Sequence, residues 1–267
     1  MNDHTGKRAG PQVVHQLIEV MGTVVTVDLF CSAGVGSSEA AVPLAKARAI
    51  LQRADSLFST WKNNSPMSRL RRGEISVADA PPEMVEVLER CAEAREISGG
   101  WFDPWAMPGG VDPTGYVKGW AAQRAIGAFA AMAIDGALVN AAGDIASFGG
   151  PAGERNFRVG IADPLAPHQL ACVVDLAGAL ATSGAYERGA HLINPHTGLP
   201  SALMASASVS GPDLGLADAL ATAVAVGGVD ALARLESIDG YEALGITFDG
   251  SRLLTSGFVL QPVPELR

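Results

Sequence analysis

Two segments that lie far apart in the chain carry residues able to hold a metal ion and a phosphate group. Residues 111–119 include Asp112 and Lys118, and residues 217–222 include Asp218 and Thr222. Carboxylate and hydroxyl oxygens are the hard ligands that magnesium prefers, and a helix start with a nearby lysine favours an anion. Together the two segments predict a magnesium ion beside a nucleotide pyrophosphate, and therefore phosphoryl-group chemistry.

The segment 217–222 is expected to lie on a helix. Asp218 then shares one face with Ala221 and Thr222, so its carboxylate lies near the threonine hydroxyl and a main-chain carbonyl. The alternative is structural, because an aspartate at the start of an alanine-rich core helix is also favoured by the helix dipole.

In the segment 111–119, Asp112 precedes an expected helix start near Gly115, and Lys118 follows within the first turns. Main-chain N–H groups and an ammonium would then converge on a phosphate, and the glycine would let a ligand approach the backbone. The alternative is an ordinary capped helix with a solvated lysine.

Other polar and aromatic groups stand beside predicted turns. Residues 182–198 hold hydroxyls, an arginine and two histidines. They lack the Gly-x-Ser-x-Gly elbow of many hydrolases, which favours a polar ligand pocket over a catalytic triad. The turn at 140–144 combines a glycine and an acid, a pattern common in turns and useful near a ligand. The tryptophans in 58–61 and 101–105 would stack on a flat heterocycle or, alternatively, pack in the core.

The order of hydrophobic patterns predicts an α+β fold in which helices cover a sheet. Helices are expected over residues 39–58, 83–97, 116–132 and 214–226. Strands are expected over 13–29 as two strands or one bulged strand, then over 136–145, 157–162, 170–176 and 205–210, with a hairpin of 240–248 and 252–260. Residues 1–12 are expected to form a flexible tail, and 13–267 a single domain. The loop 98–110 is rich in glycine, proline and aromatic residues.

Composition limits the classes of partner and compartment. The net charge of −9 over 267 residues argues against a nucleic acid or an anionic membrane surface as a partner. Three scattered cysteines suggest neither a zinc site nor a disulfide framework and fit a reducing compartment. The polar N-terminus is not typical of a secretory leader, and no apolar run is expected to be long enough to span a membrane. The protein is therefore expected to be cytoplasmic and not membrane-inserted.

Read in order, eight short motifs resemble those of the ApbE family, the FAD:protein FMN transferases. The motifs are at residues 21–23, 58–61, 100–104, 111–119, 139–144, 182–184, 191–198 and 217–222. The resemblance implies an ApbE-like, T-fold-related α+β fold of mixed sheet and helix layers. It also implies one FAD bound in a cleft as substrate, and Mg²⁺ at its pyrophosphate.

The resemblance also implies roles for individual residues. The metal-ligand positions fall on Gly115, Asp218, Ala221 and Thr222. The FAD-contacting positions fall on Met21, Trp61, Trp101, Phe102, Asp103, Asp112, Lys118, Ser183, His191 and Leu192. His191 matches a histidine near the phosphates that would orient or deprotonate a hydroxyl, so the implied catalytic residues are His191, Lys118 and Asp218.

The implied activity is transfer of FMN from FAD to a threonine or serine hydroxyl of an acceptor flavoprotein, with release of AMP. The alternatives are a magnesium-dependent FAD pyrophosphatase and a non-enzymatic FAD carrier. The chain departs from the family pattern in a much shorter connection between Pro104 and Asp112, in Trp61 where a tyrosine is common, and in Ala142 where a glycine is common.

Overall fold

The structure is a computed structural model that describes residues 12–31, 37–176, 178–184 and 192–263. Its α-helices are α1 (Ser37–Phe58), α2 (Pro66–Arg71), α3 (Pro82–Ile97), α4 (Thr114–Ile126) and α6 (Leu214–Leu235). Its strands are β1 (Gln12–Val20), β2 (Thr23–Cys31), β3 (Gly136–Ala141), β4 (Asp144–Gly149), β5 (Phe157–Ala162), β6 (Leu170–Leu176), β7 (Ala179–Gly184), β8 (Ser206–Gly211), β9 (Glu242–Ile246) and β10 (Arg252–Leu254). Short 3₁₀ turns are η1 (Val77–Asp79), η2 (Pro104–Ala106) and η3 (Gly127–Phe129).

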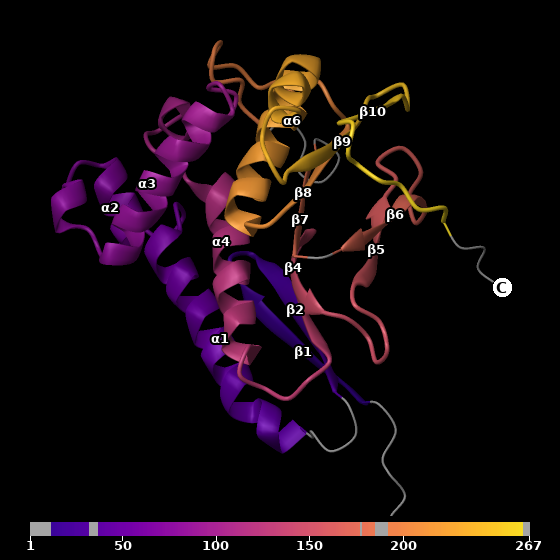
Figure 1. Cartoon of the computed structure of the whole chain (residues 1–267). Helices are drawn as coiled ribbons and strands as arrows, with labels where there is room; N and C mark the ends of the chain where they lie inside the picture. The colour runs from indigo at the N-terminus through magenta and orange to yellow at the C-terminus, as the bar shows by residue number, and fades with distance from the viewer. Residues whose placement is uncertain (1–11, 32–36, 177, 185–191, 264–267) are drawn as a thin grey trace, which may run out of the picture.

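An 8-stranded sheet in the order β1-β2-β3-β4-β7-β8-β9-β10 forms the centre of the structure. Helices α1, α4 and α6 cover one side of the strands, and the β5–β6 hairpin lies on the other side (Figure 1). The larger apolar core lies between the sheet and the helices, and a smaller one lies under β5 and β6. The α+β fold expected from the sequence is therefore confirmed.

The strand pairing brings several turns to one end of the sheet. Val25 of β2 pairs with Ala141 at the end of β3, and Ile145 of β4 pairs with Leu180 of β7. The β1–β2 turn, the β3–β4 turn and the end of β7 therefore lie side by side. All strand pairs in the sheet are antiparallel, so the other ends of these strands face away from this group of turns.

Both hairpin turns at this end contain two residues with positive φ. They are Met21 (φ 54°) with Gly22 (φ 69°), and Ala142 (φ 52°) with Gly143 (φ 94°). Two-residue hairpins need such angles, which a residue with a Cβ adopts only with strain. Met21 and Ala142 therefore hold unfavourable backbone conformations beside each other in the sheet.

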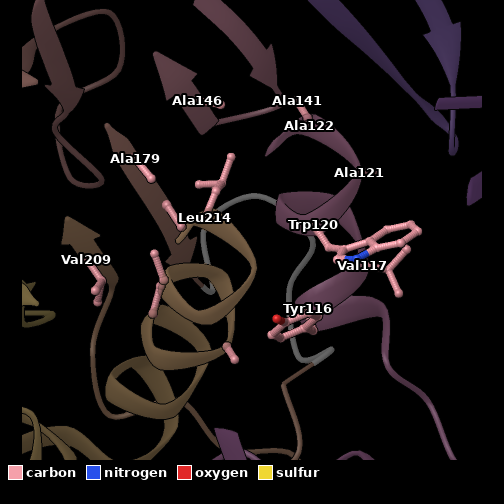
Figure 2. Packing of buried hydrophobic residues seen from close by; sticks show 14 of the residues in the cluster. Tyr116, Val117, Trp120, Ala121, Ala122, Ala141, Ala146, Ala179, Val209 and Leu214 are labelled. Carbon is pink, nitrogen blue, oxygen red and sulfur yellow. The ribbon is translucent and has the colours of Figure 1, made fainter. Parts of the chain in front are cut away.

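Helices α4 and α6 approach each other very closely. A Cβ added at Gly119 would lie 2.3 Å from the carbonyl oxygen of Leu214, and one added at Gly215 would lie 2.8 Å from the Tyr116 ring. Figure 2 shows Tyr116, Val117 and Trp120 of α4 beside the start of the helix that carries Leu214. The glycines let the two backbones nearly touch, with small residues filling the space around them.

By length and composition alone, α6 could cross a membrane, but 72% of its most apolar window is buried in the protein. The expectation that no apolar run approaches a membrane span is therefore wrong for this segment, and its hydrophobicity is explained by its place in the core. The helix continues past the expected end at Val226 through a kink at Gly228, whose φ is 59°. The carbonyl of Ala225 before the kink accepts hydrogen bonds from the N–H groups of Leu203 and Met204.

Most other elements agree with the sequence patterns. Strands β5 and β6 have the expected bounds, and residues 13–29 form two strands. The segment 136–145 is wrong as one strand, because the turn at Ala142 and Gly143 separates β3 from β4. Helix α2 was not expected, α4 ends earlier than predicted, and the last hairpin is shorter. Residues 1–11 of the expected tail lie outside the described residues, and Gln12 already belongs to β1.

Replacing Gly119 with alanine tests the contact between α4 and α6. We expect Gly119→Ala to lower the free energy of unfolding by about 2 to 4 kcal/mol, because the new methyl group overlaps a backbone carbonyl that has little room to move. Urea unfolding followed by circular dichroism measures the change.

The matched control is Gly127→Ala at the end of the same helix. Gly127 has φ −60° and no atom within 4 Å of an added Cβ. This variant should be as stable as the wild type, or more stable by about 0.5 to 1 kcal/mol. Equal effects at the two positions would contradict the close contact.

Candidate functional site

Three charged side chains meet where α4, α6 and β4 come together. The ammonium Nζ of Lys118 lies 2.5 Å from Oδ2 of Asp144. On α6, Oδ2 of Asp218 accepts a hydrogen bond of 3.2 Å from the main-chain N–H of Gly119. Asp144 is 0% exposed and Asp218 is 3% exposed. The three side chains form what we call the charged cluster.

The charged cluster holds two carboxylates and one ammonium, so it has an excess of negative charge. Burial raises the pKa of Asp218 well above the usual aspartate range, and the negative charge of Asp144 raises it further. Lys118 and the N–H of Gly119 act in the opposite direction but are weaker. The site therefore favours either a proton on Asp218 or an additional cation.

A second group of contacts continues the site by one helical turn. The hydroxyls of Ser183 and Thr222 lie 3.2 Å apart, which joins the end of β7 to α6. A Cβ added at Gly115 would lie 3.3 Å from the Thr222 hydroxyl and 3.3 Å from the Phe102 ring. Ala221, the remaining predicted metal position, is buried on α6 directly before Thr222. The structure therefore brings most of the predicted metal and phosphate residues together.

These residues fit a magnesium ion by the chemistry of their atoms. In the part of the chain that the structure describes, no three His, Cys, Asp or Glu side chains are grouped as a metal site. Magnesium commonly uses only one or two carboxylates, with substrate phosphates and other oxygens completing its shell. In a regular helix the N–H of Gly119 would bond the carbonyl of Gly115, and the Asp218 carboxylate competes for that N–H. Asp218, the Thr222 hydroxyl and the Gly115 carbonyl form such an oxygen set.

Lys118 does not lie free at the helix start as the sequence suggested. Its partner is Asp144, which in the sequence stands out only as the acid of the turn at 140–144 and as the last residue of the motif at 139–144. Asp144 is placed by the tight β3–β4 turn, and its Oδ1 accepts a 3.3 Å hydrogen bond from the N–H of Thr182. The signal that could have identified Asp144 is the motif at 139–144, in which a buried strand ends in glycine and aspartate.

Aromatic groups lie on the loop before α4. The ring of Phe102 is buried against Gly115, and Trp101 packs against Gly227 of α6. The Trp101 ring also meets the imidazole of His196 edge to face, with centroids 4.6 Å apart. In the sequence His196 is one of the two histidines of residues 182–198 and belongs to the motif at 191–198, but no role of its own is predicted for it.

The remaining predicted site residues are placed as follows. Met21 is half-buried at the β1–β2 turn, on the same end of the sheet as Asp144. Leu192 is buried, and Asp103 pairs with Arg95 at 2.7 Å and caps η2. Trp61 is 92% exposed, so the structure does not join it to this group. His191 lies outside the described residues.

Asp112 lies at the start of α4, where Arg71 of α2 fixes the short connection. One oxygen of Asp112 accepts a hydrogen bond from the N–H of Thr114, and the other lies 3.1 Å from the Arg71 guanidinium. Arg71 also donates to the carbonyl oxygens of Pro108 (2.8 Å) and Val111 (3.2 Å). Arg71 therefore clamps the backbone of the short connection between Pro104 and Asp112. Arg71 could not be identified from the sequence, because α2 itself was not expected.

Comparisons with known proteins bear on the family and the fold of this chain. The sequence profile of the ApbE family matches residues 21–110 and 107–244. This chain belongs to the ApbE family. A relative from Rhodobacter capsulatus, an "FAD:protein FMN transferase", is 36% identical over 167 residues, which are 59% of this chain and 30% of that protein. The similarity therefore spans less than half of that relative's length.

Solved structures of ApbE proteins share the fold. The flavin transferase ApbE of Vibrio cholerae has a TM-score of 0.81 at 19% identity, covering 93% of this chain and 98% of that one. The ApbE protein of Thermotoga maritima has a TM-score of 0.79 at 20% identity, covering 92% and 97%. The flavinyl transferase ApbE of Pseudomonas stutzeri, in its apo form, has a TM-score of 0.78 at 21% identity, covering 94% and 96%. At these identities the likeness shows the fold, and it extends over nearly the whole of each chain.

We expect Arg71→Gln to loosen the connection before α4. Loss of an Arg71 side chain that bonds two carbonyls and a carboxylate should lower the free energy of unfolding by about 1 to 3 kcal/mol. Chemical denaturation measures this change.

Arg69→Gln is the matched control on the same short helix. The Arg69 guanidinium is half-exposed and lies 3.7 Å from Glu74. Its loss should change the stability by no more than about 0.5 kcal/mol. If the two variants lose the same stability, the clamp does not hold the connection.

Proposed function

We propose that this ApbE-family chain transfers the FMN part of FAD to a threonine or serine hydroxyl of an acceptor protein, with magnesium bound. The observation that carries this proposal is the charged cluster of Lys118, Asp144 and Asp218 beside the hydroxyls of Ser183 and Thr222. Such a cluster combines a cation for phosphate with oxygens for a metal. The names of the Rhodobacter and Vibrio relatives support the same reaction.

In this proposal, Asp218, Thr222 and the carbonyls of Gly115 and Ala221 hold the ion. Magnesium, when bound, offsets negative charge on the pyrophosphate and on the leaving group. Lys118 adds a positive charge at the same place, and its position is fixed by Asp144. Because the residues that would hold the ion include only one carboxylate, the ligand's own phosphates would complete its set of oxygens.

The proposed step is a displacement at the phosphorus on the FMN side of the pyrophosphate. The acceptor hydroxyl oxygen forms a bond to this phosphorus, the bond to the bridging oxygen breaks, and AMP leaves with that oxygen. His191, from its place in the family motif, is proposed to take the hydroxyl proton. Such a reaction depends on positioning and charge neutralisation more than on covalent catalysis. Trp101 and Phe102 would support the flavin or the adenine ring by stacking.

Asp218→Asn tests the metal role without emptying the site. Asparagine keeps an oxygen for the N–H of Gly119 but cannot carry the negative charge, so magnesium-dependent AMP release should fall by about 100-fold or more. The measurement is AMP release from FAD and magnesium in the presence of a candidate acceptor domain. Asp230→Asn, an exposed change on the same helix, is the control and should keep full activity.

The same variant gives a reading of stability that does not depend on activity. Folding raises the pKa of Asp218, so above the ordinary aspartate range the folded protein keeps a proton that the unfolded chain releases. In EDTA, the free energy of unfolding of the wild type should therefore fall as the pH rises through this range. Magnesium should also raise the melting temperature of the wild type. Asp218→Asn should remove both the fall with pH and this increase. If Asp218→Asn keeps both the pH dependence and the stabilisation by magnesium, groups other than Asp218 cause them.

Following AMP and acceptor mass together separates the candidate reactions. AMP with an acceptor mass gain of one FMN supports the transferase. AMP with free FMN and an unchanged acceptor would indicate an FAD pyrophosphatase. FAD that binds equally well with and without magnesium, and is not consumed, would indicate a carrier and contradict the proposal.

A further inference from the structure

The edge of the large sheet at β1 is long and regular. Strand β1 spans 9 residues without lysine or proline, and within the described chain it pairs with β2 alone. Natural edge strands are usually short, charged, bent or covered, because an open edge pairs with other strands. By contrast, the strand at the other edge of the sheet, β10, has only 3 residues.

The outer face of the β1–β2 hairpin is also open, and it carries exposed apolar side chains between polar ones such as His15 and Asp28. Val13, Leu17 and Val24 are 56%, 52% and 45% exposed. The β5–β6 hairpin covers the neighbouring part of this face, where Phe157 meets Phe30 with ring centroids 4.9 Å apart. The helices lie on the opposite side of the sheet (Figure 1). The open edge of β1 and the exposed apolar side chains beside it therefore form one continuous surface.

The hairpin register shows which backbone groups of β1 face outward. The two-residue turn makes Val20 and Thr23 a hydrogen-bonded pair, and bonded pairs then alternate along the ladder. The N–H and C=O groups of Val13, His15, Leu17 and Glu19 consequently point away from β2. In agreement, the Leu17 carbonyl accepts a hydrogen bond from the side-chain amide of Gln16 and not from β2.

These four outward residues are self-complementary in one antiparallel register. When a two-fold axis passes through Leu17, that residue meets its own copy, and His15, which pairs with Asp28 of its own hairpin at 2.5 Å, meets Glu19 of the other copy. In the same register Val13 lies opposite the β1–β2 turn, at the end of the paired strands, so the apolar pair is Leu17 with its own copy. An axis at Gln16 would instead oppose Val13 to Glu19, and an axis at His15 would oppose two imidazoles. Only the axis at Leu17 matches both the polar and the apolar pairs.

We propose that two copies of this chain associate through antiparallel pairing of β1 with β1, centred on Leu17, so that their two 8-stranded sheets become continuous. The occupant of the edge is thus a second copy of the same chain. The pairing satisfies the outward N–H and C=O groups and covers Leu17 on the outer face. It leaves the charged cluster, which lies on other strands and helices, unaltered.

Sedimentation velocity of the full chain over about 1 to 100 µM tests the association. The wild type should sediment as a dimer at the higher concentrations. Leu17→Lys places two ammonium groups opposite each other and should raise the dimer dissociation constant by about 100-fold or more. Leu170→Lys, the same change at an exposed position of β6, should sediment like the wild type.

Cysteine cross-linking tests the register. Paired Leu17→Cys residues would have Cα atoms about 5.5 Å apart, within the range of a disulfide. In Val13→Cys, the two cysteines would be about 27 Å apart and should not cross-link. The natural cysteines Cys31, Cys91 and Cys172 are buried and do not compete. Circular dichroism of each variant confirms that it has folded.

Several outcomes would overturn the proposal. If the wild type stays monomeric up to about 100 µM, the two copies do not pair through β1. A dimer that persists in Leu17→Lys would place the interface on another surface. Equal cross-linking of Leu17→Cys and Val13→Cys would contradict the register. A dimer that dissociates with Leu17→Lys and cross-links only through Leu17→Cys would support it.

Discussion

The close approach of α4 to α6 at Gly119 is the constraint on which the site depends. The absence of a side chain there lets the backbone of α4 lie against Leu214 and lets its N–H reach the Asp218 carboxylate. That approach places Asp218 within the field of Asp144 and Lys118, and burial then makes its charge costly. Packing and chemistry are therefore coupled, because the glycine that lets two helices meet also brings the acidic groups together.

Much of the fold could be predicted from hydrophobic periodicity. Residues 157–162 and 170–176 are bounded by turn residues, and the bounds of both strands were correct. The error at 136–145 arose because Ala142 takes a positive φ, which propensity does not predict for alanine. Helix α2 lies between Phe58 and Pro82, where it is too short for its periodicity to stand out. Strand order and register are long-range properties that only the folded chain shows.

The candidate site was predicted in part, and largely through the resemblance. Asp218, Thr222 and Gly115 do lie together with Ser183 and Phe102, although single motifs could not distinguish this from an ordinary helix start. Asp144 and Arg71 were missed because their roles depend on partners distant in the chain, Lys118 and residues 108–112. Trp61 was expected at the site but is exposed. Side-chain partnerships of this kind require the sheet register and the helix packing to be known.

The hydrophobicity of α6 has a consequence for synthesis of the chain. A helix that could cross a membrane by length and composition would be a hazard if it left the ribosome before its covering surfaces existed. In this chain α4 and strands β1 to β8 precede it, and only β9 and β10 follow among the described elements. Most of the segments that contact α6 have already been translated when it emerges, with β9 following it, and domains can begin to fold during translation. Its late position therefore lets it dock onto strands that have already been made.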